Sequence, residues 1–209
     1  MKLHFLALGL LLVTSSFALV PIGENARKLE KVFDSMQVEK LWIAGAIVNW
    51  RTGEPTGKAI TDNGKHTHCS QFAAAVCDRL GIYLLHPPEH GNTLLANAQF
   101  DWLPADGRAK GWSPVRDGEQ AQDMANKGNL VIAICKNPDP AKSGHIAIVR
   151  PSNKTVGQIA KEGPVIIQAG GHNYQSTSLK RGFGNHAEQF ANGQIRYYSH
   201  PVTINESVK

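Results

Sequence analysis

The stretch that decides the fold runs from His66 to Gly81 and has the sequence HTHCSQFAAAVCDRLG. Its apolar residues recur at helical spacing and Gly81 supplies a stop signal, so the stretch predicts a helix that opens on Cys69. The free N–H groups and the dipole of a helix start favour an anion, and a thiol placed there loses its proton more easily. Because the thiolate is the form that attacks carbonyl groups, Cys69 is the candidate nucleophile.

A nucleophilic thiol needs a base, and the base needs a group that orients it. The segment GHIAIV predicts a strand that begins on His145, and the segment VIIQA predicts a second apolar strand that carries Gln168. If the two strands are neighbours, Gln168 can hold the His145 ring by a hydrogen bond. His172 competes for this third role, although the two glycines before it predict a flexible turn. The chain order is therefore Cys69, His145 and then a polar residue.

The first 18 residues have the three parts of a secretory signal peptide. Lys2 gives a positive start, residues 3–13 are apolar, and Ser16 and Ala18 form a small-x-small cleavage site. The apolar run is shorter than the roughly 20 residues that span a bilayer. We therefore expect a signal peptide at 1–18 and one soluble, exported domain at 19–209, extracellular or periplasmic, monomeric and with no membrane span after cleavage.

The charge of the chain is mildly basic, with a formal net value of +5. The basic residues are spread along the sequence and form no cluster. This pattern fits weak attraction to an anionic surface or polymer and is too diffuse to indicate nucleic-acid binding.

Three cysteines are an odd number for an exported protein. If Cys69 is the working thiol, Cys77 and Cys135 are left over. These two residues either form a disulfide between a helix and a strand, or are two buried, small, apolar side chains. The sequence leaves both alternatives open.

Helical patterns come first along the chain and strand patterns follow. Apolar residues at helical spacing predict helices over 24–40, 66–81, 93–102 and 117–126, whereas 41–50 fits a short helix or a strand. Strands are predicted over 130–135, 145–150, 165–169 and 195–199. This order predicts an α+β fold in which an antiparallel sheet packs on the cysteine helix.

The helix opening on Cys69, the strand GHIAIV and the later strand with Gln168 together resemble the CHAP family of cysteine, histidine-dependent amidohydrolases and peptidases. They resemble equally the NlpC-type cell-wall peptidases of the same papain-like superfamily. The resemblance covers roughly residues 60–200 and rests on these three short motifs. A helix that begins on the catalytic cysteine, packed against an antiparallel sheet, is the papain-like fold that it implies.

The resemblance also implies an activity, the hydrolysis of amide bonds in peptidoglycan or in a peptide. The scissile bond would lie in the stem peptide, or between the sugar and its first alanine, as in N-acetylmuramoyl-L-alanine amidases. Cys69 would be the nucleophile that forms a thioester, His145 the general base and Gln168 the orienting residue. The reaction needs no metal or other cofactor.

Four further residues are candidates for contact with the substrate. Asn63 lies six residues before the cysteine, where its amide could help the Cys69 backbone N–H to hold an oxyanion. His68 directly precedes the cysteine. Trp112 lies in an irregular stretch rich in glycine and proline, where a tryptophan either walls a ligand cleft or, more often, packs as satellite core. His172 is the fourth candidate.

Two other functions belong to different classes. The histidines 66, 68, 172 and 186 could assemble a metal site in a secreted metal-dependent hydrolase, because His-x-His is a real ligand spacing. No His-Glu-x-x-His helix motif accompanies them. The third possibility is a non-catalytic wall-binding domain on the same fold.

Overall fold

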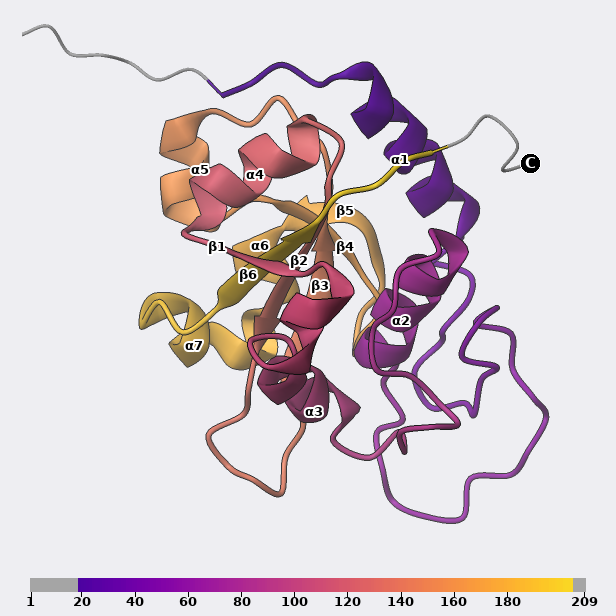
Figure 1. The fold of residues 1–209 in the computed structure, drawn as a ribbon. Helices are drawn as coiled ribbons and strands as arrows, with labels where there is room; N and C mark the ends of the chain where they lie inside the picture. The colour runs from indigo at the N-terminus through magenta and orange to yellow at the C-terminus, as the bar shows by residue number, and fades with distance from the viewer. Residues whose placement is uncertain (1–18, 205–209) are drawn as a thin grey trace, which may run out of the picture.

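The computed structural model describes residues 19–204, which form an antiparallel sheet with helices on both of its faces (Figure 1). The six strands lie in the order β1-β6-β2-β3-β4-β5, and every neighbouring pair is antiparallel. They are β1 (Ser113–Val115), β2 (Leu130–Cys135), β3 (His145–Val149), β4 (Val165–Gln168), β5 (Tyr174–Ser178) and β6 (Arg196–His200). The predicted signal peptide at 1–18 lies outside the described residues.

Within residues 19–204, seven α-helices accompany the sheet. They are α1 (Glu24–Ser35), α2 (Cys69–Arg79), α3 (Leu95–Trp102), α4 (Gly118–Asn126), α5 (Val156–Glu162), α6 (Leu179–Gly182) and α7 (Ala187–Ala191). Two short 3-10 helices lie at Asp106–Lys110 and Gly184–His186. The α+β class and the antiparallel sheet predicted from the sequence are confirmed.

The central strands β2 and β3 are buried along their whole length because helices cover both faces of the sheet. Successive side chains of a strand point to opposite faces, so each strand contributes to two apolar clusters. The isoleucines at 132, 134, 146 and 148 pack in the cluster that includes α2. Residues 131, 133, 147 and 149 pack in the cluster that includes α4. This two-sided burial explains why both strands are continuous apolar runs in the sequence.

The cysteine helix begins at Cys69, as the sequence predicts, and ends at Arg79. Every residue from Cys69 to Cys77 is buried, because α2 packs against the sheet on one side and under other segments on the other. The three alanines at 73–75 allow this close packing, since a larger side chain would hold the helix away from the strands. Gly81 follows with a φ of +68°, the left-handed conformation that ends many helices.

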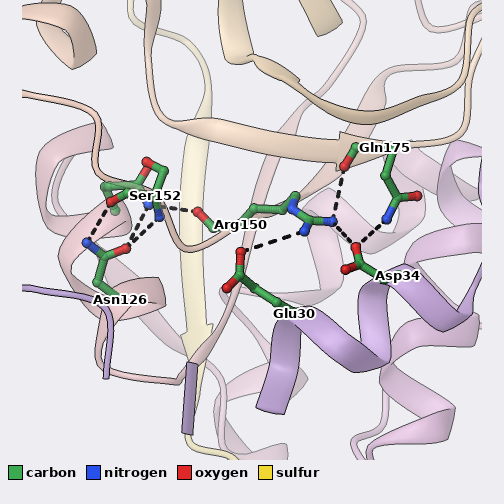
Figure 2. A network of polar contacts seen from close by, with 7 residues as sticks. Glu30, Asp34, Asn126, Arg150, Ser152 and Gln175 are labelled. Atoms are coloured by element: carbon green, nitrogen blue, oxygen red, sulfur yellow. Dashed lines mark hydrogen bonds and ion pairs between the residues drawn. The ribbon is translucent and has the colours of Figure 1, made fainter. Parts of the chain in front are cut away.

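Arg150 directly follows β3 and ties α1 to the sheet (Figure 2). One guanidinium nitrogen donates to the Asp34 carboxylate at 2.8 Å and to the backbone carbonyl of Gln175 at 3.2 Å. The other lies 3.6 Å from the carboxylate of Glu30. Only 10% of the Arg150 side chain is exposed. A buried charge of this kind is tolerated because two opposite charges and a carbonyl surround it.

Several short elements were not predicted. The strand β5 has the sequence YQSTS, and its side chains are half-buried or exposed because it lies at the edge of the sheet. The helix α5 buries only Ile159 and is held at its start by the Thr155–Gln158 capping box. Residues 41–50 form turns with a single bridge, between Val48 and Pro55, and neither the short helix nor the strand considered for this segment forms.

The two remaining cysteines do not form a disulfide, and all three are free. Cys77 packs in the apolar cluster on the α2 side of the sheet, and Cys135 packs in the cluster on the opposite side. The sheet therefore separates the two thiols. Of the two alternatives, the structure shows the pair of buried, small, apolar side chains.

In the part of the chain from 19 to 204, no helix combines the length and hydropathy that crossing a bilayer requires.

Candidate active site

The Cys69 thiol lies at the start of α2 and against the start of β3. The backbone N–H groups of Ile146, of Ser70 and of Cys69 itself are directed at the sulfur. The last two belong to the first turn of the helix, where N–H groups have no partner within the helix. The first belongs to the residue that directly follows His145. The fold thus brings the candidate nucleophile to the residue next to the candidate base.

Two opposing effects act on the Cys69 thiol. Burial is the larger and raises its pKa, because a thiolate loses solvation in an apolar setting. The three backbone N–H groups lower the pKa, since they stabilise the thiolate. The helix start acts in the predicted direction, but burial outweighs it and raises the pKa, so the expectation that this thiol ionises more easily than a free one is wrong. Ionisation of Cys69 requires a base.

His145 and Gln168 are hydrogen-bonded, with 2.8 Å between the ring Nε2 and the amide Oε1. The amide nitrogen of Gln168 donates to the carbonyls of His172 at 3.3 Å and of Gly182 at 3.2 Å. These two carbonyls require the nitrogen of the amide on their side, so its oxygen faces the imidazole. Because an amide oxygen only accepts, Nε2 of His145 carries the proton and Nδ1 keeps its lone pair. Nδ1 is therefore the nitrogen available as a base.

Two further rings enclose the imidazole of His145. The Phe183 ring meets it edge-on, with 4.6 Å between centroids, and the His186 ring is nearly parallel to it at 5.7 Å. Burial lowers the pKa of His145, and the hydrogen bond that its ring N–H donates to Gln168 opposes this effect. Burial and the neighbouring His145 lower the pKa of His186 to about 4. Both imidazoles are therefore neutral at neutral pH.

The thiol and the imidazole lie on opposite faces of the sheet at the start of β3, so the structure does not bring these two side chains together. Cys69 packs with the α2 cluster, whereas the His145 ring contacts Phe183, which belongs to the other cluster. Among the hydrogen bonds of residues 19–204, none joins the two side chains directly. The link between them is the Ile146 N–H, which contacts the sulfur one residue beyond the base.

Of the two candidates for the orienting role, Gln168 and His172, the structure places only the Gln168 side chain against the imidazole. The Gln168 side chain bonds the imidazole, whereas the exposed His172 contributes its backbone carbonyl to the Gln168 amide. Within β4, Gln168 follows Ile167, which pairs with Ile148 of β3. The strand pairing thus places Gln168 beside the beginning of β3.

Asn63 and His68 differ in their surroundings. Asn63 is exposed, and none of the contacts of the described residues joins it to Cys69. His68 is buried, and its Nδ1 lies 2.6 Å from Oε1 of Gln71. The carbonyls of Ala46 and Ile43 lie near the His68 ring and favour its protonated form, although burial is the larger effect and lowers its pKa. In this conformation His68 is part of the packing around the helix start.

Trp112 does not wall a cleft. Its side chain is 1% exposed, and its indole N–H donates to the backbone carbonyl of Tyr83 at 2.9 Å. The turn at Gly111, with a φ of +92°, leads into β1 and directs the indole into the core. The stretch from 102 to 115 is thus partly regular, and the expectation that Trp112 contacts substrate is corrected.

The histidines of the metal-site alternative are dispersed. The His66 ring lies 2.7 Å from the Asp62 carboxylate, His68 bonds Gln71, and His186 lies against His145. Across residues 19–204, the structure places no group of three or more His, Cys, Asp or Glu side chains where they could hold a metal ion.

Comparisons with known proteins assign this chain to no family. No protein-family model matches the chain, and no curated protein matches it at a significant level. The chemistry of the site is therefore argued from its geometry.

Proposed function

We propose that this protein is an exported cysteine amide hydrolase with a papain-like fold that cleaves peptidoglycan. One observation carries the proposal: the thiol at the start of α2 lies against the backbone N–H of Ile146, next to His145, whose tautomer Gln168 sets. The exported location rests on the signal-peptide pattern of residues 1–18.

The chemistry follows from the protons of the three side chains. In the proposed reaction Nδ1 of His145 must reach Cys69 across the start of β3 to take its proton, and the sulfur then attacks the carbonyl carbon of the scissile amide. The backbone N–H of Cys69 stabilises the negative oxygen that develops. The imidazolium then protonates the amine as it leaves, and a thioester remains on Cys69. Water attacks the thioester with His145 as base, which releases the acid and restores the thiol.

The role of Gln168 is to hold the His145 ring in one orientation and one tautomer throughout this cycle. Its oxygen accepts from Nε2 both when the ring is neutral and when it is charged. An amide stabilises the imidazolium less than a carboxylate would, so the proton on His145 is easily passed on to the leaving amine.

The test is digestion of purified peptidoglycan by the mature protein, with the products identified by mass spectrometry. We expect the wild type to release muropeptide fragments, whose masses identify the bond cleaved, and Cys69→Ala to release none. Cys77→Ala is the matched control, because it removes a buried thiol from the same helix and leaves the proposed site intact. It is expected to retain activity.

Two other results would contradict the proposal in different ways. Equal digestion by wild type and Cys69→Ala would make the cysteine structural. An intact wall with both proteins, together with sedimentation of both with the wall, would favour the non-catalytic wall-binding alternative.

A further inference from the structure

A side chain on α3, Asn97, holds the chain that leads into His145. Its Oδ1 accepts from the backbone N–H of Gly144 at 2.8 Å and from that of Asn137 at 3.3 Å. Its Nδ2 donates to the carbonyl of Lys142 at 2.9 Å. The side chain is only 6% exposed. One buried amide therefore binds both ends of the loop between β2 and β3.

Gly144 fits this arrangement because it has no side chain. A Cβ at this position would lie 2.8 Å from Oδ1 of Asn97 and would overlap the backbone carbonyl of Cys135. Any other residue would push the strand start away from α3. The glycine that precedes His145 in the sequence thus permits the contact with Asn97.

The second amide on the same helix, Gln99, holds the chain at the candidate nucleophile. Its Nε2 donates to the carbonyl of Leu85 at 2.9 Å and to that of Ser70, which directly follows Cys69, at 3.2 Å. Gln99 is fully buried, and its Oε1 has no partner within residues 19–204. An unpaired buried oxygen destabilises the fold, whereas an apolar residue would not. The benefit of an amide here is that its nitrogen fixes the position of the backbone at Ser70 and Leu85.

We propose that Asn97 and Gln99 are positioning residues that together set where His145 lies relative to Cys69. The inference rests on the proposed function. Both amides bind backbone atoms one residue from a candidate catalytic side chain, so they fix chain position directly. Two residues apart on one short helix, they cannot move independently. Loss of either lets the start of β3 shift against α2, and the sulfur then loses the stabilisation that the Ile146 N–H provides.

The experiment measures the rate at which iodoacetamide alkylates Cys69 as a function of pH. Cys77 and Cys135 are fully buried, and mass spectrometry of the peptides confirms which thiol reacts. In Asn97→Leu we expect the apparent pKa of Cys69 to rise by about one unit, so that alkylation below that pKa is about tenfold slower than in the wild type. Gln99→Leu is expected to shift the profile in the same direction.

The structure offers matched controls for both variants. Asn126 is a buried amide on α4 that donates to the carbonyl of Ser152 (Figure 2). It also donates to the carbonyl of Val20, and neither contact involves a candidate catalytic residue. Gln122, also on α4, is buried and binds the carbonyl of Arg150. Asn126→Leu and Gln122→Leu should lower the melting temperature at least as much, yet leave the pH profile of alkylation unchanged.

An alkylation profile of Asn97→Leu that coincides with that of the wild type overturns the proposal, as does an equal shift in Asn126→Leu. If Asn97→Leu does not fold, Asn97→Asp replaces it, because it keeps an acceptor for Gly144 and loses the donor to Lys142. We expect Asn97→Asp to raise the apparent pKa of Cys69 by less than Asn97→Leu does. If none of the folded variants at positions 97 and 99 shifts the alkylation profile, the proposal is refuted. Alkylation needs no substrate, so a wild type that leaves peptidoglycan intact would refute the proposed function alone.

Discussion

At the scale of single residues, Gln168 decides how His145 can react. Its amide bonds the ring through Oε1 and two carbonyls through Nε2, so it has one orientation. In Gln168→Ala the ring loses this partner and turns more freely. We expect kcat/KM for peptidoglycan to fall about tenfold to a hundredfold, a part of the 10²–10⁴ that a positioned base contributes. The pKa of His145 should also move lower, because Gln168 raises it.

Gln122→Ala is the control for this change, since it truncates another buried glutamine, which hydrogen-bonds the backbone carbonyl of Arg150 at the opposite end of β3 from His145. Histidine titrations by NMR in both variants would separate the effects. An unchanged His145 titration in Gln168→Ala would show that the hydrogen bond does not set the state of the base.

The pairing of His145 with Gln168 could be predicted because it follows from two neighbouring apolar strands. The contacts of Asn97 and Gln99 could not, because they join segments 47 and 29 residues apart, and α3 has no local pattern that points to either partner. The covering rings of Phe183 and His186 were missed for the same reason, since they lie on short elements after β5.

At the scale of elements, the sequence predicts best where burial is strongest. The strands β2, β3 and β4 are apolar almost throughout, and α4 has a clear cap at Asp117. The edge strand β5 is polar and half-exposed, so no alternation or apolar run marks it. The strand β1 spans three residues and contains Pro114. Such elements form because a neighbouring strand offers unpaired backbone groups, which is information that lies elsewhere in the chain.

The attachment of α1 to the sheet depends on the charge balance around Arg150. Removing both carboxylates in Glu30→Ala/Asp34→Ala leaves a buried guanidinium without a counter-charge, and we expect this to cost about 3–5 kcal/mol in the free energy of unfolding. Arg150→Met should cost less, because Asp34 is 56% exposed on its side chain and can be solvated by water. Urea unfolding of the two variants measures which of them loses more free energy of unfolding. A larger loss in Arg150→Met than in the double variant would contradict this account.

At the scale of the whole molecule, three buried or half-buried histidines make stability depend on pH. His68, His145 and His186 all have a pKa lowered mainly by burial. The unfolded chain therefore binds protons on these rings more readily than the folded chain. The contribution of these histidines to the free energy of unfolding is fully present above their pKa in the unfolded chain, about 6.5. It is lost as the pH drops from there towards their lower pKa values in the folded chain. The carboxylates of Asp62, Asp117 and Asp139, whose pKa values are lowered, act only at more acidic pH.

His186 is the member of this set that can be tested alone. Its pKa falls from 6.5 to about 4, so the wild type should lose stability through that window. Allowing for its partial exposure, the share of His186 is on the order of 2 kcal/mol. His186→Phe keeps a ring beside His145 but has no proton to bind, so its free energy of unfolding should fall less between pH 7 and about pH 4. Urea unfolding across this range measures the difference, and parallel pH profiles for the two proteins would show that His186 titrates alike in the folded and unfolded chains.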